Sequence, residues 1–157
     1  RQMADVLDGL FIRPNNTVMG RRVWSYLSRH PKICAAVFKN GTNQGLVTRE
    51  QFAELFELPN LPIIGEGWLN TATKGQSVNM QRIWGNDLLF FYSDMNADTE
   101  YGVTFGFTAE FGTRVAGTIA DPDMGIRGGE RIRVGESVKE LIIASDLAYL
   151  FKNAVTG

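Results

Sequence analysis

The chain has 157 residues, 44% of them apolar and 21% charged, a balance typical of a globular protein with one buried core. Its formal net charge of −1 gives no reason to expect nucleic acid or an anionic membrane as the main partner, and this balance suits protein partners at least as well. No stretch approaches the roughly 18 apolar residues of a membrane span, and the first residues lack the pattern of a signal peptide. We therefore expect a single lobe, residues 1–157, with no membrane partner.

The first third of the sequence carries the helical signals. The first dozen residues repeat apolar side chains every three or four positions, which predicts an amphipathic helix. A short strand at residues 17–19 is expected to lead through Gly20 into a second helix, which ends at Pro31. A glycine-rich and asparagine-containing loop follows. Thr48 and Gln51 then have the spacing of a capping box, which predicts the start of a third helix.

From residue 61 onward the pattern changes to strands. Short apolar runs, each bounded by Gly, Asn or Asp, lie at residues 62–64, 68–69, 83–84 and 88–92. Residues 101–111 alternate apolar with small or polar side chains and predict one long, half-buried strand. A loop is expected at 112–129, before further strands near 131–134 and 141–151. The order predicts an α+β fold, with helices first and a mostly antiparallel or mixed sheet afterwards.

Groups able to perform chemistry are few. Ser77 lies in a sequence that approaches a nucleophile elbow but lacks its closing glycine, and His30 is the one histidine available as a base. Cys34 is close enough in sequence to His30 to form a catalytic pair, but packing in an apolar environment is favoured. One His and one Cys cannot supply a zinc site. We expect no catalytic residue, cofactor or metal; a small hydrolase using Ser77 or Cys34 is the alternative among enzymes.

Four arginines are candidates for a subunit interface. Arg127, Arg131 and Arg133 lie within seven residues, and Arg114 lies in the same expected loop as Arg127. Phosphate contact is less favoured, because the excess of positive charge is small and no basic helix accompanies it. Salt bridges at a subunit interface, or a solvated strand face, fit these residues better.

The order of the motifs resembles that of tailed-phage major capsid proteins. Residues 13–20 read Arg-Pro-Asn-Asn-Thr-Val-Met-Gly, and Val-Trp and Arg-His-Pro follow at 23–24 and 29–31. The similarity continues through Ile-Trp-Gly-Asn-Asp at 83–87, the aromatic segment from 101 and the C-terminal residues from 133. It covers nearly the whole chain.

This resemblance implies the Hong Kong 97 phage fold, in which an axial domain surrounds pentamer and hexamer centres and a peripheral domain lines the capsomer edge. It implies that residues 1–157 form the axial domain with returning peripheral-domain strands, and that the family's N-terminal arm, extended loop and spine helix are absent from this chain. The implied function is that of a structural subunit, not an enzyme, which self-assembles into an icosahedral capsid around phage DNA.

The implied partners are neighbouring copies in the capsomer, with a scaffold, portal or decoration protein as further candidates. Packaged DNA would lie nearby without sequence-specific binding. The implied location is the virion capsid, after synthesis in the bacterial host cytoplasm. An encapsulin-like protein container of the same fold is the alternative among self-assembling proteins.

Overall fold

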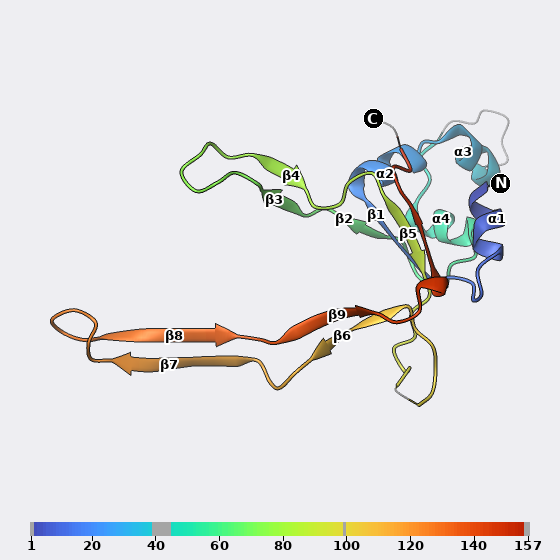
Figure 1. Ribbon diagram of the computed structural model, residues 1–157. Helices are drawn as coiled ribbons and strands as arrows, with labels where there is room; N and C mark the ends of the chain where they lie inside the picture. The colour runs from blue at the N-terminus through green and yellow to red at the C-terminus, as the bar shows by residue number, and fades with distance from the viewer. Residues whose placement is uncertain (1, 39–44, 99, 156–157) are drawn as a thin grey trace. The chain divides into compact units, whose positions relative to one another are not determined.

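The computed structural model describes residues 2–38, 45–98 and 100–155, which fold as two compact units (Figure 1). The core unit comprises the described residues of 1–105 and 144–157, and the ribbon unit comprises residues 106–143. Strand pairing underlies this division, because the strands of residues 106–143 pair with one another and with no other described strand. The loop expected around residues 41–44 lies outside the described residues.

The described α-helices of the core unit precede residue 56, as predicted. They are α1 (Gln2–Asp8), α2 (Arg21–Leu27), α3 (Pro31–Phe38) and α4 (Arg49–Leu55). Of the described helices, none has the length and apolar composition needed to cross a membrane.

Two of the helix boundaries confirm the sequence analysis and one corrects it. Gly20 joins a strand directly to α2, and the capping box is present, with the Thr48 hydroxyl accepting from Gln51 N–H and the Gln51 side chain accepting from Thr48 N–H. Pro31 was expected to end a helix, but it begins α3. Its fixed φ and missing N–H suit the first turn of a helix, where no hydrogen bond is lost.

A mixed four-stranded sheet supports these helices. Its order is β10 (Ala148–Phe151), β5 (Leu88–Phe91), β1 (Asn16–Gly20) and β2 (Ile63–Gly65). β2 is parallel to β1, whereas β5 is antiparallel to both of its neighbours. The parallel pair requires a long crossover connection, which here contains α2, α3 and α4. The short 3₁₀ helix η1 (Ser145–Leu147) precedes β10.

The core of this unit contains side chains from the helices and from the central strands. Phe52 of α4 and Phe90 of β5 are fully buried, and the Phe56 ring lies within 6.2 Å of the Phe90 ring, centroid to centroid. The buried Thr17 hydroxyl donates to the Leu89 carbonyl oxygen at 3.1 Å, so this polar group is satisfied. The helices in the first third of the chain and the mixed sheet confirm the predicted α+β fold.

A short hairpin extends the chain between β2 and β5. It pairs β3 (Trp68–Asn70) with β4 (Met80–Arg82) in antiparallel register. The strand expected at residues 83–84 is wrong, because the chain bends there. Ile83 N–H donates to the Gly67 carbonyl oxygen, and the Trp84 ring lies against Gly65.

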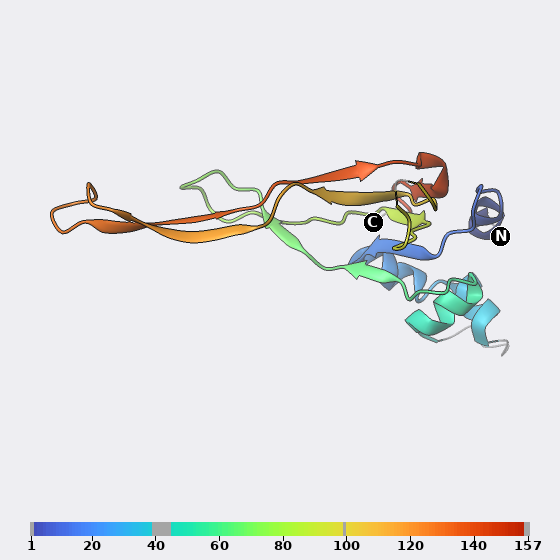
Figure 2. The ribbon, with the colours of Figure 1, turned by 90° about the horizontal axis from the view of Figure 1, so that it is seen from below.

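The ribbon unit is a long, bulged β-hairpin (Figure 2). Its base pairs β6 (Gly106–Glu110) with β9 (Val138–Ile142), and its outer part pairs β7 (Val115–Asp121) with β8 (Gly129–Gly135). Between these two ladders, the four residues 111–114 lie opposite the two residues 136–137, so the strands change register at a bulge.

Two strand predictions are corrected by this hairpin. The expected long strand at 101–111 is paired only over 106–110, and the expected loop at 112–129 contains β7. The prediction that this strand is half-buried is also wrong, since Phe107 is 48% exposed and Phe111 is 88% exposed. Strand formation without a covering layer leaves both faces of a two-stranded ribbon open to solvent.

Candidate assembly surfaces

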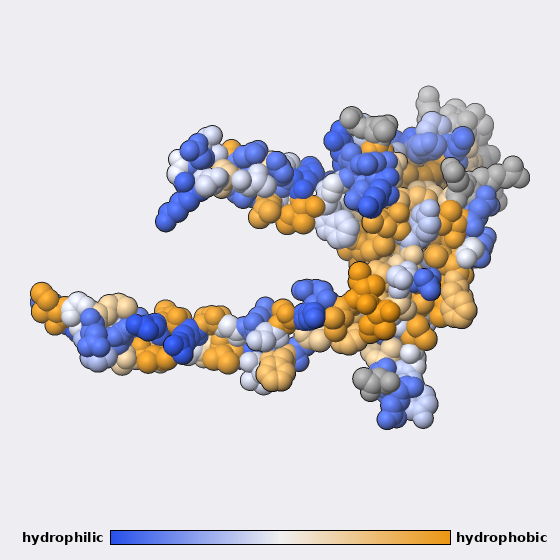
Figure 3. All heavy atoms as spheres, in the orientation of Figure 1, coloured by the Kyte–Doolittle hydropathy of each residue, from blue (hydrophilic) through white to orange (hydrophobic). Residues whose placement is uncertain are grey.

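Exposed apolar side chains lie on both faces of the outer part of the ribbon unit, and one of these faces carries no arginine. Side chains alternate along a strand, and paired residues share a face, so the register gathers one set on the same side. This set, called here the apolar face, consists of Ala116, Thr118, Ala120, Ile132 and Val134, with Glu130 at its outer end. Ile132 is 72% exposed and Val134 is 73% exposed. Figure 3 shows hydrophobic residues reaching the surface along β7 and β8.

The opposite face of β7 and β8 carries the charged candidates. Arg131 lies opposite Ile119 in the register and forms an ion pair with Asp121, whose side chain is only 15% exposed. Arg133 lies opposite Gly117 and makes no ion pair with any described residue. The structure therefore places Arg131 and Arg133 on one face, next to each other along alternate positions of β8.

The other two arginines lie at the two ends of β7. Arg114 is at the bulge, where its Nε donates to a Glu136 carboxylate oxygen at 2.7 Å. Arg127 lies in the loop at the tip of the ribbon and, among the described residues, has no ion-pair partner. The four arginines thus occupy one hairpin without forming a single cluster.

The β3–β4 hairpin presents a second exposed apolar surface. Trp68 is 50% exposed and Ile83 is 63% exposed, and the Arg82 guanidinium lies 4.4 Å from the centroid of the Trp68 ring. The cation and the ring attract each other, so Arg82 holds the indole in place. The sequence analysis did not identify this surface, because three-residue strands are too short to show alternation.

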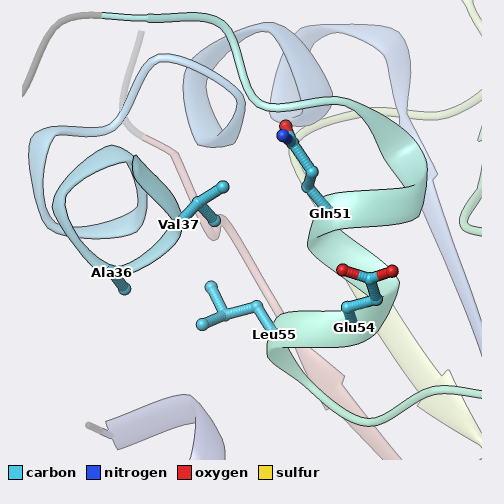
Figure 4. Close-up of a pocket in the computed structure, with 5 residues that line it drawn as sticks. All are labelled: Ala36, Val37, Gln51, Glu54 and Leu55. Atoms are coloured by element: carbon cyan, nitrogen blue, oxygen red, sulfur yellow. The ribbon is translucent and has the colours of Figure 1, made fainter. Parts of the chain in front are cut away.

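A groove crosses the helical side of the core unit. It has a volume of about 810 Å³, and its lining residues come from α1, α2, α3, α4 and the end of the chain after β10. A smaller depression of about 220 Å³ continues it between α3 and α4 and shares Ala36 and Leu55 with it. In Figure 4, Val37 and Leu55 point toward this space, and Gln51 and Glu54 lie along α4. Because its residues come from separate segments, sequence periodicity did not predict this groove.

The residues considered for catalysis are not brought together. Ser77 is exposed in the loop of the β3–β4 hairpin, whereas Cys34 is 1% exposed inside the core unit, with its Sγ 3.4 Å from the Gly45 carbonyl oxygen. His30 Nδ1 accepts a hydrogen bond from Lys32 N–H at the start of α3. Among the described residues, no group of three His, Cys, Asp or Glu side chains is placed to hold a metal ion.

Two exposed carboxyl groups have a lowered pKa. Asp98 accepts hydrogen bonds from the backbone N–H groups of Tyr101 and Glu100, at 2.6 and 2.8 Å, and these lower its pKa. The pKa of Glu50 is lowered by a backbone hydrogen bond and by the Thr48 hydroxyl at the start of α4. Both carboxylates stabilise local turns of the backbone and neither faces another reactive group.

Comparison with known proteins gives one consistent result. Residues 1–127 match the family described as phage major capsid protein E. The major capsid protein of Pseudomonas phage JBD67 is 49% identical over 158 residues, which cover 99% of this chain and 50% of that protein. The crystal structure of a phage-related protein from Bordetella bronchiseptica RB50 has a TM-score of 0.72 at 19% identity, and the match covers 98% of this chain and 50% of that one. The chain thus spans about half the length of the relatives it matches.

Proposed function

This chain belongs to the phage major capsid protein E family, as the order of its motifs indicated, and from this premise we propose that it is part of a structural subunit of a phage capsid. The observation that carries the proposal is the 49% identity to a phage major capsid protein over 99% of the chain. The role is assembly and not catalysis, and the location is the capsid of the virion, after synthesis in the host cytoplasm. The neighbouring copies of the chain are its main partners.

The division into two units suggests how the chain corresponds to the regions of a Hong Kong 97 subunit. We assign the core unit to the axial domain, around the centres of pentamers and hexamers, and the ribbon unit to the returning strands of the peripheral domain. The likeness in fold to a phage-related protein, at a TM-score of 0.72, supports a shared fold. The uncovered apolar face supports the assignment, because a two-stranded ribbon gains stability when another surface covers it.

The arginines of the ribbon unit have two roles in this proposal. Arg114 and Arg131 neutralise Glu136 and Asp121 within the ribbon and keep its strands in register. Arg127 and Arg133 make no ion pair with a described residue and are available to carboxylates of a neighbouring copy. Packaged DNA lies near such a shell without sequence-specific contact, and a scaffold, portal or decoration protein is a further partner.

Expression of the full-length gene product with its neighbouring phage genes tests this function. Light scattering and electron microscopy are expected to show closed, uniform shells. A product that stays a small monomer in every assembly condition would contradict the proposal. Shells that protect DNA from nuclease in the infected host support a capsid, and shells that enclose only protein would instead indicate an encapsulin-like container.

A further inference from the structure

We propose that the tip of the ribbon unit, residues 122–128, docks into the groove of the core unit of a second copy of this chain. The proposed contact lies at one end of the groove, where the groove continues between α3 and α4. This inference rests on the proposed function, since it assumes that copies of the chain pack against one another. It specifies which two surfaces meet.

The tip presents two apolar side chains to solvent. Ile126 is fully exposed, at 105% of its reference area, and Met124 is 48% exposed. Gly125 between them has a φ of +68°, a conformation that glycine adopts without strain and that turns the chain sharply. Two exposed apolar side chains next to each other on a tight turn can act together as an anchor for a pocket on a partner.

Opposite charges flank these apolar side chains. Asp123 directly precedes Met124, and Arg127 directly follows Ile126. Asp121 and Arg131, at the ends of the adjoining strands, are already paired with each other. Among the described residues neither Asp123 nor Arg127 has an ion-pair partner, so both charges are available to another chain.

The groove has the complementary pattern. Ala36 and Leu55 belong to both the groove and its continuation between α3 and α4, and Ile33 extends the apolar floor. Lys32 of α3 lines the groove on one side of this floor, and Glu54 of α4 lines the continuation. Neither charge pairs with a described residue. Asp123 of the tip would therefore face Lys32 of the groove, and Arg127 of the tip would face Glu54. Met124 and Ile126 would lie on the apolar floor between these two charges.

A second copy fits the groove better than a small molecule does. Binding sites for small molecules place a few buried polar groups where they fix the orientation of the ligand. In the described part of the chain, every buried side-chain nitrogen or oxygen already has a hydrogen-bond partner. The groove thus offers apolar area with charges at its margin, which is the usual anatomy of a protein interface.

A disulfide trap tests the pairing directly. Full-length gene product carrying Ile126→Cys and a differently tagged copy carrying Ala36→Cys are assembled together into shells and oxidised. The expected result on non-reducing gels is a covalent heterodimer that accounts for most of the Ala36→Cys chain. The matched control replaces Ala36→Cys with Ser77→Cys, an exposed position in the β3–β4 hairpin loop, and yields at least tenfold less heterodimer. Equal yields for both partners, or no heterodimer, would overturn the inference.

Charge reversal gives an independent test that does not need a disulfide. Arg127→Glu and Glu54→Arg are each expected to lower the yield of shells about tenfold, and the double variant is expected to recover most of the yield. Lys74→Glu, in the β3–β4 hairpin loop, serves as the control and keeps the yield unchanged. Normal yields from both single variants would show that the contact does not exist while leaving the capsid function intact. Failure of the natural sequence to form any shell would instead reject the proposed function.

Discussion

Thr118 of β7 and Ile132 of β8 lie directly opposite each other on the apolar face of the ribbon unit. The threonine methyl and the isoleucine side chain form a cross-strand pair, yet Ile132 remains 72% exposed, and β7 and β8 pair with no other described strand. Folding of the hairpin alone therefore does not explain the apolar face. The proposed contact between copies would cover it.

Substitution of this isoleucine tests that explanation. Ile132→Glu is expected to change the thermal unfolding of the unassembled chain little, because exposed substitutions usually alter stability by less than about 0.5 kcal/mol. It is expected to abolish shell formation, because burying an unpaired carboxylate costs several kcal/mol in each subunit. Light scattering measures assembly and circular dichroism measures unfolding. Ile132→Val is the control and should assemble normally; normal assembly of Ile132→Glu would mean that the apolar face stays in solvent.

The contact between Gly65 and Trp84 predicts a local effect on the core unit. A Cβ added at Gly65 would overlap the Trp84 ring, so Gly65→Ala forces the ring or the strand to move. We expect a loss of about 1–3 kcal/mol in the free energy of unfolding, measured by urea denaturation. Gly85→Ala is a matched control, because a Cβ there meets nothing within 4 Å. Equal stability of the two variants would contradict the tight packing of Trp84.

The capping box at α4 predicts a smaller effect. Thr48→Ala removes the hydroxyl that accepts a hydrogen bond from Gln51 N–H at 3.3 Å. The expected cost is about 1 kcal/mol in the free energy of unfolding, measured by thermal denaturation. Thr48→Ser keeps the hydroxyl and should retain most of the stability. A loss as large in the serine variant as in the alanine variant would show that the methyl group, and not the hydrogen bond, matters.

The lowered pKa of Asp98 predicts the pH dependence of its turn. The charged carboxylate accepts hydrogen bonds from Tyr101 and Glu100 N–H, so folding favours the charged form. Its contribution to stability is complete above the ordinary pKa of an aspartate and is lost as the pH falls through the lowered value. The protection of Tyr101 N–H from hydrogen exchange, measured relative to the intrinsic exchange rate at each pH, should fall in that acid range, and in Asp98→Ala it should be low at every pH. A carboxyl pKa at or above the ordinary value, measured by NMR titration, would refute this.

The sequence predicted most of the core unit because its signals are local. The capping box of α4, the turn at Gly20 and the apolar run of β5 each depend on neighbouring residues, and all three are confirmed. Pro31 misled the analysis, since proline both ends one helix and begins the next.

The ribbon unit was harder to predict for a physical reason. β7 contains Ala and Gly between its larger side chains, and most of its residues are exposed. Its sequence therefore does not alternate between clearly apolar and clearly polar residues, which is the pattern that predicts a strand. The pattern at residues 101–105 indicated a strand, but Phe105 N–H donates to the Tyr92 carbonyl oxygen of the core unit. That bond joins residues 101–105 to the core unit, and pairing with β9 begins only at Gly106. The groove is lined by four helices from separate segments of the chain. The periodicity of a sequence predicts each helix but not how the helices pack together.

Electron cryomicroscopy of shells assembled from the full-length gene product would show directly whether the ribbon unit lies at a contact between copies. We expect an icosahedral shell in which each ribbon unit contacts a neighbouring copy, with Ile132 and Val134 buried in the contact. Particles in which this apolar face remains open to solvent, or a product that forms no particles, would contradict it.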